Sequence, residues 1–193
     1  IPSPLKVKFG KLSTEKLNLW NDVNHFISDW YSPNDKMVLQ TSGSTGKPKS
    51  IKVKKEWMKN SAQLTGKTFE LMEGDSTLLC MPMKYVAGKM MVVRALELEL
   101  DLKVIEPCSN PLKNINKPIN FAAMVPLQLE NSLKDLAKIK KLIVGGGQVN
   151  SKLVEKLRSI STYVYETYGM TETLTHVAIK PLNGSNKQDV FQA

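Results

Sequence analysis

The run of small, hydroxyl-bearing and glycine residues at positions 41–49 (TSGSTGKPK) has the composition of a phosphate-holding loop. Its glycines let the backbone approach a ligand closely, and its hydroxyls can rotate to donate to phosphate oxygens. Lys47 and Lys49 add positive charge, and a lysine ammonium suits phosphate. The run is not a Walker A loop, because Pro48 stands five positions after Gly43, where that motif has glycine. A flexible, polar hairpin loop is the alternative, since Ser/Gly/Thr runs are common in linkers.

A second segment, residues 165–173 (YETYGMTET), combines aromatic rings, a glycine turn, hydroxyls and a carboxylate. The ring of Tyr168 can stack on a base, and the Thr171 hydroxyl can donate to a phosphoryl oxygen. The Glu172 carboxylate suits a Mg²⁺ ion held mainly by substrate phosphates and water. The alternative is a strand that ends in a turn with a surface glutamate.

A third candidate is the glycine run that follows the apolar residues Ile143 and Val144. It consists of Gly145, Gly146 and Gly147. A strand that ends in a flexible turn explains the same residues.

Between these segments, short apolar runs alternate with longer helical patterns, which predicts an α/β fold with a mainly parallel sheet flanked by helices. Strands are expected at 37–40, 49–54, 78–81, 102–105, 120–125, 142–144, 162–166 and 175–179. Helices are expected around 57–72 and at 86–98, 126–139 and 152–159, the last capped by Ser151. Residues 36–193 are expected to form this domain, and residues 1–35 a lead-in without a motif.

The composition is that of an ordinary globular protein, with 41% hydrophobic and 23% charged residues and a net charge of +9. Lysines spread along the chain carry most of this charge, and Arg94 and Arg158 are the two arginines. A solvated lysine surface is therefore favoured over a nucleic-acid-binding face. The positive field would also steer polyanions such as ATP or coenzyme A.

The sequence shows no zinc-ligand spacing around its two cysteines and no apolar run near the roughly 20 residues that a bilayer span needs. It has no signal-peptide pattern, and we expect a cytoplasmic protein without a membrane segment. The chain does not begin with methionine, so we expect a fragment of a longer protein. Oligomeric state is not indicated.

Residues 41–49 resemble the phosphate-binding loop of the adenylate-forming superfamily, whose pattern is [TS]-[ST]-G-[ST]-T-G-x-P-K. This superfamily includes acyl-CoA synthetases, luciferases and peptide-synthetase adenylation domains. Residues 168–172 are similar to its Y-G-x-T-E signature, and the two matches stand in the family's order. In the family, a glycine-rich strand end between them lines the adenine and acyl pockets, where Gly147 replaces the frequent alanine or glutamate.

This resemblance implies a part of the large N-terminal domain of the adenylate-forming fold. It implies that ATP and a carboxylic acid form an acyl-adenylate and pyrophosphate, after which a thiol, here coenzyme A, accepts the acyl group. Lys49, Thr171 and Glu172 would be catalytic, with Glu172 also binding Mg²⁺. The other implied nucleotide contacts are Thr41, Ser42, Gly43, Ser44, Thr45, Gly46, Gly145, Gly146, Gly147, Tyr168 and Gly169. Of these, the hydroxyl residues of the loop would contact the pyrophosphate, Thr171 the α-phosphate and Tyr168 the adenine.

The family continues with a ribose-binding aspartate, a hinge and a small C-terminal domain with a catalytic lysine. Residues 174–193 contain none of these, so the resemblance covers most of this chain but only part of the family's N-terminal domain. We therefore expect the isolated chain to be inactive alone. A non-catalytic nucleotide-binding module is the alternative.

Residues 81–88 (MPMKYVAG) resemble the family's L-P-L-[FY]-H-x-x-G stretch, with Tyr85 in place of the histidine. Peptide-synthetase adenylation domains have an aspartate shortly after this stretch, which pairs with the amino group of the substrate. No acidic residue stands at 86–89 here, so the resemblance disfavours an amino-acid substrate. Arg94 shares a helical stripe with apolar residues, so a snorkelling surface arginine is one interpretation. Residues 86–96, 125–129 and 171–178 nevertheless look most like o-succinylbenzoate–CoA ligases of menaquinone synthesis, where a basic residue on this helix faces the dicarboxylate. His176 is either a pocket residue or a core histidine, and another aryl- or acyl-CoA synthetase remains the alternative.

Overall fold

The computed structural model describes residues 14–41, 49–174, 176–184 and 190–192. Its centre is a six-stranded sheet in the order β4-β3-β5-β6-β7-β8, in which β8 alone is antiparallel to its neighbour. The strands are β3 (Ser76–Leu79), β4 (Asp101–Val104), β5 (Ile119–Met124), β6 (Ile139–Val144), β7 (Tyr163–Gly169) and β8 (His176–Pro181). The predicted α/β fold with a mainly parallel sheet is confirmed.

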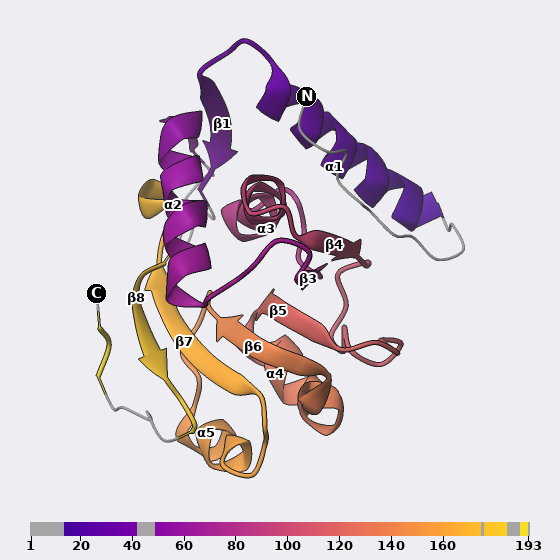
Figure 1. The fold of residues 1–193 in the computed structure, drawn as a ribbon, viewed down its shortest axis with the longest axis vertical. Helices are drawn as coiled ribbons and strands as arrows, with labels where there is room; N and C mark the ends of the chain where they lie inside the picture. The colour runs from indigo at the N-terminus through magenta and orange to yellow at the C-terminus, as the bar shows by residue number, and fades with distance from the viewer. Residues whose placement is uncertain (1–13, 42–48, 175, 185–189, 193) are drawn as a thin grey trace.

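Helices cover both faces of this sheet (Figure 1). One side carries α1 (Thr14–Tyr31), α2 (Lys55–Thr68) and α3 (Val86–Glu97), and the other carries α4 (Pro126–Ser132) and α5 (Ser151–Leu157). Successive strand residues alternate between two apolar cores, as Leu78 and Leu79 do in β3. Strands buried on both faces explain the continuous apolar runs of the sequence.

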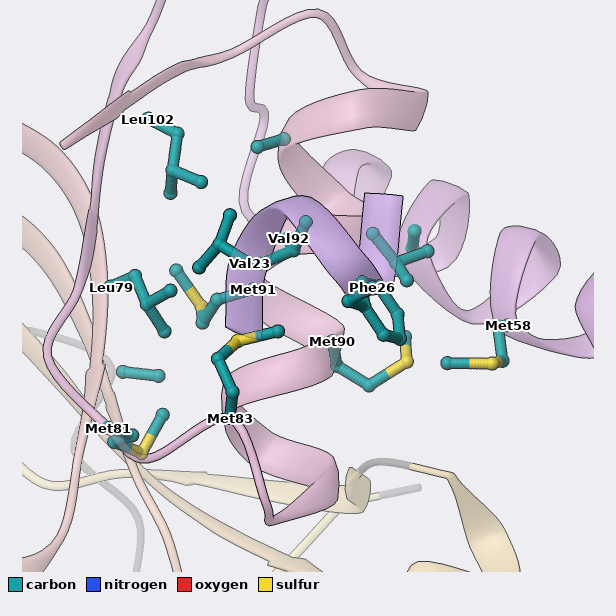
Figure 2. Packing of buried hydrophobic residues seen from close by; sticks show 14 of the residues in the cluster. Val23, Phe26, Met58, Leu79, Met81, Met83, Met90, Met91, Val92 and Leu102 are labelled. Carbon is teal, nitrogen blue, oxygen red and sulfur yellow. The ribbon is translucent and has the colours of Figure 1, made fainter. Parts of the chain in front are cut away.

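Helix α3 is the most deeply buried helix on its side, because apolar residues occupy nearly its whole circumference. Figure 2 shows the methionines Met81, Met83, Met90 and Met91 around this helix, together with side chains from α1 and the sheet. Methionine is unbranched and flexible, so it fills the irregular space between three helices and a twisted sheet. The same core includes Phe26 of α1, so this helix is packed onto α3.

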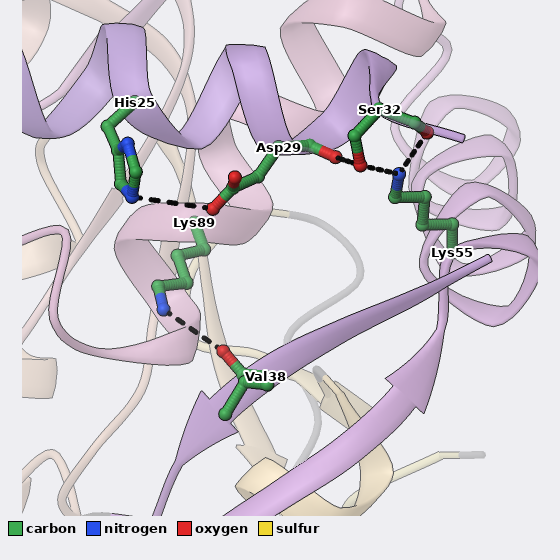
Figure 3. A network of polar contacts seen from close by, with 6 residues as sticks. All are labelled: His25, Asp29, Ser32, Val38, Lys55 and Lys89. Carbon is green, nitrogen blue, oxygen red and sulfur yellow. Dashed lines mark hydrogen bonds and ion pairs between the residues drawn. The ribbon is translucent and has the colours of Figure 1, made fainter. Parts of the chain in front are cut away.

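A separate antiparallel hairpin, β1 (Lys36–Gln40) with β2 (Ser50–Lys54), brackets the predicted phosphate loop. Polar contacts hold it against the helices (Figure 3). The Lys89 ammonium donates to the Val38 carbonyl at 3.5 Å, and the buried Lys55, which follows β2, donates to the Ser32 carbonyl at 2.9 Å. The predicted hairpin is confirmed, and its position is fixed relative to α1 and α3.

Three local predictions were wrong. The helix that begins at Pro126 ends at Ser132 and continues as a 3₁₀ helix, η1 (Leu133–Lys138), because Ile139 is needed to start β6 opposite Ile119. Asn150, not Ser151, caps α5, since its side-chain oxygen accepts from the Leu153 amide at 2.9 Å. Helix α2 ends at Thr68, so Met72 lies outside it and is exposed.

No helix in the described parts of the chain combines the length and apolar character that crossing a membrane requires.

Asn183, just after β8, ties three segments together. Its amide group donates to the carbonyls of Leu157, Ile160 and Thr162 at 3.1, 3.3 and 2.8 Å, and its oxygen accepts from the Val164 amide at 3.0 Å. This buried side chain therefore joins the end of α5 to the start of β7.

We expect Asn183→Ala to lower the free energy of unfolding by about 3 kcal/mol, because buried backbone groups lose their partners. The matched control is Asn131→Ala, whose exposed side chain makes a hydrogen bond to the Leu127 carbonyl. That change should stay within about 0.5 kcal/mol. Urea denaturation of both variants measures the difference, and equal costs would contradict this role for Asn183.

Candidate active site

Two of the predicted site segments, the glycine turn and the segment around Tyr168, lie at the carboxyl ends of neighbouring parallel strands. Met124 of β5 is paired with Val144 of β6, and Val144 with Glu166 of β7. The glycine turn that follows β6 is therefore adjacent to the last residues of β7. In open α/β sheets, ligands bind at this edge.

The glycine turn is built around a close approach of two strands. A Cβ atom at Gly145 would stand 2.8 Å from the Thr167 hydroxyl oxygen, closer than carbon and oxygen tolerate. Gly146 has a φ of +78°, which disfavours other residues. A Cβ at Gly147 would meet the Pro126 ring at 3.6 Å, an ordinary contact. Positions 145 and 146 thus require glycine, whereas position 147 has space for a side chain.

The end of β7 and the segment that follows it carry the aromatic and acidic groups. Tyr168 is exposed near the end of β7, and the short 3₁₀ helix η2 (Thr171–Thr173) follows. Thr171 is buried and Glu172 exposed. The Met170 amide donates to the Thr173 hydroxyl at 3.0 Å, which closes the turn. Leu174, with a φ of +68°, buries its side chain in the core and anchors the end of η2.

The phosphate loop is described at its two ends, Thr41 and Lys49. The Thr41 amide donates to the Lys49 carbonyl at 2.9 Å, and the Lys49 amide donates to the Thr41 hydroxyl oxygen at 3.0 Å. These bonds close the neck of the loop and leave the Lys49 side chain exposed. The predicted contacts Ser42, Gly43, Ser44, Thr45 and Gly46 lie outside the described residues.

Arg94 is fully buried in α3, with 2% of its surface exposed. The interpretation as a snorkelling surface arginine is therefore wrong. Its Nε donates to the Thr65 hydroxyl oxygen at 3.2 Å, across the contact between α2 and α3. Burial lowers the pKa of the Arg94 guanidinium to about 10, so the group stays charged at pH 7.

His176, at the start of β8, belongs to the same region. Its ring centroid lies 6.1 Å from that of Phe69, at the end of α2. Burial and the positive charge of Arg94 lower the pKa of His176 to about 4, so the imidazole is neutral at pH 7. A buried cation and a neutral imidazole are thus brought together from α3 and β8, which lie far apart in the sequence. The second histidine, His25, is exposed on α1, 3.6 Å from Asp29.

Tyr85 stands at the opposite end of α3 from Arg94. It precedes α3, nine residues before Arg94, which corresponds to about 13 Å along a helix axis. Its exposed ring lies under the Lys84 ammonium at 4.9 Å. A cavity of about 380 Å³ lies nearby, between α1, β1 and the connection into α3, but none of the predicted site residues lines it.

Thr65, Leu174 and Glu166 were not predicted as site residues. No sequence signal identifies Thr65 as the partner of Arg94, because the contact joins two helices. The alternation of β7 does place Glu166 on the same face as the buried Val164, which could have marked a buried carboxylate.

A mainly parallel sheet with glycine-rich and Tyr-Gly turns at its carboxyl edge, together with a hairpin that brackets a Ser/Gly/Thr loop, is the arrangement that the resemblance to adenylate-forming enzymes implies. The sequence pattern of the AMP-binding enzyme family matches residues 5–191. The chain belongs to this family, which confirms the resemblance.

Curated relatives include the 2-succinylbenzoate–CoA ligase of Lactococcus lactis, which is 27% identical over 188 residues. This match covers 88% of the chain and 41% of the relative, so the chain spans less than half the length of that relative. A solved structure of an AMP-forming acyl-CoA synthetase/AMP-acid ligase II-like protein from Dyadobacter fermentans has a TM-score of 0.83 and 38% identity. The match covers 90% of this chain and 51% of that chain.

An o-succinylbenzoate coenzyme A synthetase from Bacillus subtilis, solved in complex with ATP and magnesium, has a TM-score of 0.69 at 23% identity. That match covers 78% of this chain and 34% of the neighbour and supports the fold.

The low pKa of His176 predicts a pH dependence of stability. The His176 imidazole takes up a proton near pH 6.5 in the unfolded chain but only near pH 4 in the folded chain. Between these values the unfolded state binds more protons, so the free energy of unfolding should fall as the pH drops from 6.5 to 4. His176 should contribute on the order of 3 kcal/mol to this fall, and we expect His176→Gln to abolish that contribution. Urea denaturation across this pH range measures it.

His25→Gln is the matched control, because His25 is exposed and lies on α1. It should leave the His176 contribution in place. An unchanged pH dependence in His176→Gln would contradict a half-buried imidazole that is neutral in the folded chain.

Proposed function

We propose that this chain is the nucleotide-binding part of an enzyme that uses ATP to convert a carboxylic acid into an acyl-adenylate and then transfers the acyl group to coenzyme A. We propose o-succinylbenzoate as the acid, which would place the protein in menaquinone biosynthesis and in the cytoplasm. The buried Arg94, whose positive charge acts on the neutral His176, is the observation that carries the substrate assignment. The names of the curated relatives support it.

On the nucleotide side, the glycine turn allows close approach to the ligand, and the exposed Tyr168 offers an aromatic face to adenine. Lys49 and the hydroxyls of its loop would neutralise and orient the phosphates. Thr171 would donate to the α-phosphate. The chain's main task is to hold the acid's carboxylate in line with that phosphate while charge develops.

A single exposed carboxylate at the start of η2, Glu172, fits Mg²⁺, which is commonly bound through one or two carboxylates, water and substrate phosphates. The ion would supply charge neutralisation at the phosphates.

On the acid side, o-succinylbenzoate has two carboxylates and only one is activated. The other must stay an anion in a partly dry pocket, where an unpaired charge is costly. Arg94 would supply a permanent charge, and the neutral His176 can donate a hydrogen bond without depending on pH. A buried guanidinium is less suited to the apolar tunnel of a long-chain acyl ligase.

The phosphate-side assignment predicts that Lys49→Ala and Glu172→Gln each lower the rate of ATP–pyrophosphate exchange about a hundredfold, because both remove groups that stabilise developing charge. Lys52→Ala and Glu130→Gln, two exposed residues outside the predicted site, are the matched controls and should retain the exchange rate. The assay uses the protein in its full natural length. Exchange at the original rate in both site variants would refute the assignment.

The acid-side assignment predicts that Arg94→Ala raises KM for o-succinylbenzoate by a factor that corresponds to about 2–4 kcal/mol of binding free energy. This is the cost when one member of a desolvated charge pair is lost. Arg94→Lys keeps the charge but not the planar donor fork, so it should recover part of this loss. KM for ATP should change little.

Benzoate, which lacks the second carboxylate, provides an internal comparison and should not be penalised to the same degree. Arg158→Ala changes the exposed arginine that pairs with Glu155 and serves as the matched control. Unchanged o-succinylbenzoate kinetics in a folded Arg94→Ala variant would remove the substrate assignment and leave another aryl- or acyl-CoA ligase as the alternative. Failure of the protein to bind ATP or to catalyse exchange with any acid would remove the enzyme assignment itself.

A further inference from the structure

An ion pair between a buried carboxylate and a half-buried lysine lies next to the proposed nucleotide site. Glu166 of β7 exposes 4% of its side chain, and its Oε2 is 2.6 Å from the Nζ of Lys180 in β8. Its other oxygen, Oε1, accepts a hydrogen bond from the Val149 amide at 2.7 Å. One carboxylate therefore joins β8 to the segment that follows the glycine turn.

The pair extends to Tyr168 through an aromatic ring. The Lys180 ammonium lies 4.9 Å from the centroid of the Phe191 ring, which is within the range of a cation–π contact. The Phe191 centroid is 6.4 Å from that of Tyr168, with the two rings inclined at 64°. Contacts thus run from Val149 through Glu166, Lys180 and Phe191 to Tyr168.

The series of contacts depends on the ion pair, because Glu166 is buried. A carboxylate this deeply buried is stable only while it is paired and hydrogen-bonded. Glu166 and Lys180 are directly opposite each other in the β7–β8 register, so the backbone itself sets their approach. Loss of the lysine charge would leave the buried carboxylate uncompensated, so the carboxylate would take up a proton or move towards water. Either change would weaken its bond to the Val149 amide.

We propose that the Glu166–Lys180 ion pair is a positioning device that fixes the glycine turn at 145–147 relative to Tyr168, and so sets the shape of the adenine side of the nucleotide site. This inference rests on the proposed function, because it takes the turn and Tyr168 as nucleotide contacts. Glu166 acts on the glycine turn through the Val149 amide, and Lys180 acts on Tyr168 through the Phe191 ring.

The central experiment is ATP binding by Lys180→Met, measured by calorimetry on the protein in its full natural length. We expect Kd for ATP to rise about tenfold, because displacement of a binding group by a fraction of an ångström has effects of this size or larger. KM for the carboxylic acid should stay within about twofold. Lys180→Arg keeps the cation and should restore most of the ATP affinity.

Lys138→Met is the matched control. Lys138 forms an ion pair with Asp135 at 2.8 Å in η1. It directly precedes β6 and so lies at the amino ends of the parallel strands, away from the proposed nucleotide site. This variant should bind ATP like the original protein.

Phe191→Ala tests the same device from its other end, because it keeps both members of the ion pair and removes the exposed ring that links Lys180 to Tyr168. We expect it to weaken ATP binding about threefold, through the loss of the contact with Tyr168. Amide hydrogen exchange offers a readout that needs no ligand, and exchange at Val149 should be faster in Lys180→Met than in Lys138→Met.

Unchanged ATP affinity in both Lys180→Met and Phe191→Ala would overturn the inference, as would an equal rise of KM for ATP and for the acid. If Lys180→Met does not fold, Phe191→Ala alone decides between the two outcomes. Failure of the unmodified protein to bind ATP would instead refute the proposed function on which the inference rests.

Discussion

The close approach of β6 and β7 at their carboxyl ends is the constraint on which the arrangement of the candidate site depends. Parallel pairing of β5, β6 and β7 places three strand ends side by side, and the Thr167 hydroxyl occupies the space where a side chain at Gly145 would stand. The Gly145 amide donates to the Met124 carbonyl at 3.1 Å, so the turn is also tied to β5. The result is a backbone edge that a nucleotide can approach closely.

Two ionic groups, Arg94 and Glu166, are unusual in their burial. Arg94 lies among methionines and valines in α3, and Glu166 is almost completely enclosed next to β8. Such groups are costly to desolvate and need specific partners. Thr65 contributes to holding Arg94, and Lys180 and the Val149 amide hold Glu166. Each partner comes from a different element, so the charges also constrain how the elements pack.

Much of the fold could be predicted because the chain's local signals agree with its tertiary structure. The apolar runs before Gly145 and after Glu99 predicted buried strands, and Pro126 marked the start of a helix. The boundaries were less predictable. The helix after Pro126 is cut short by the pairing of Ile139 with Ile119, a long-range requirement that propensity does not contain. Asn150 and Ser151 are both competent caps, and the local backbone decides between them.

The sequence by itself determined the family, most strands and helices after residue 36, and the segments that carry hydroxyls, glycines and the Tyr-Gly turn, because these are local patterns of residue type. It did not predict α1 in the lead-in. The tertiary structure alone decided which of the separate residues meet. It buried Arg94 rather than exposing it, placed His176 within reach of its charge and set Tyr85 apart on the surface. It also joined Glu166 to Lys180 through strand register. Proximity arises from contacts between segments far apart in the chain, and no local spacing encodes it.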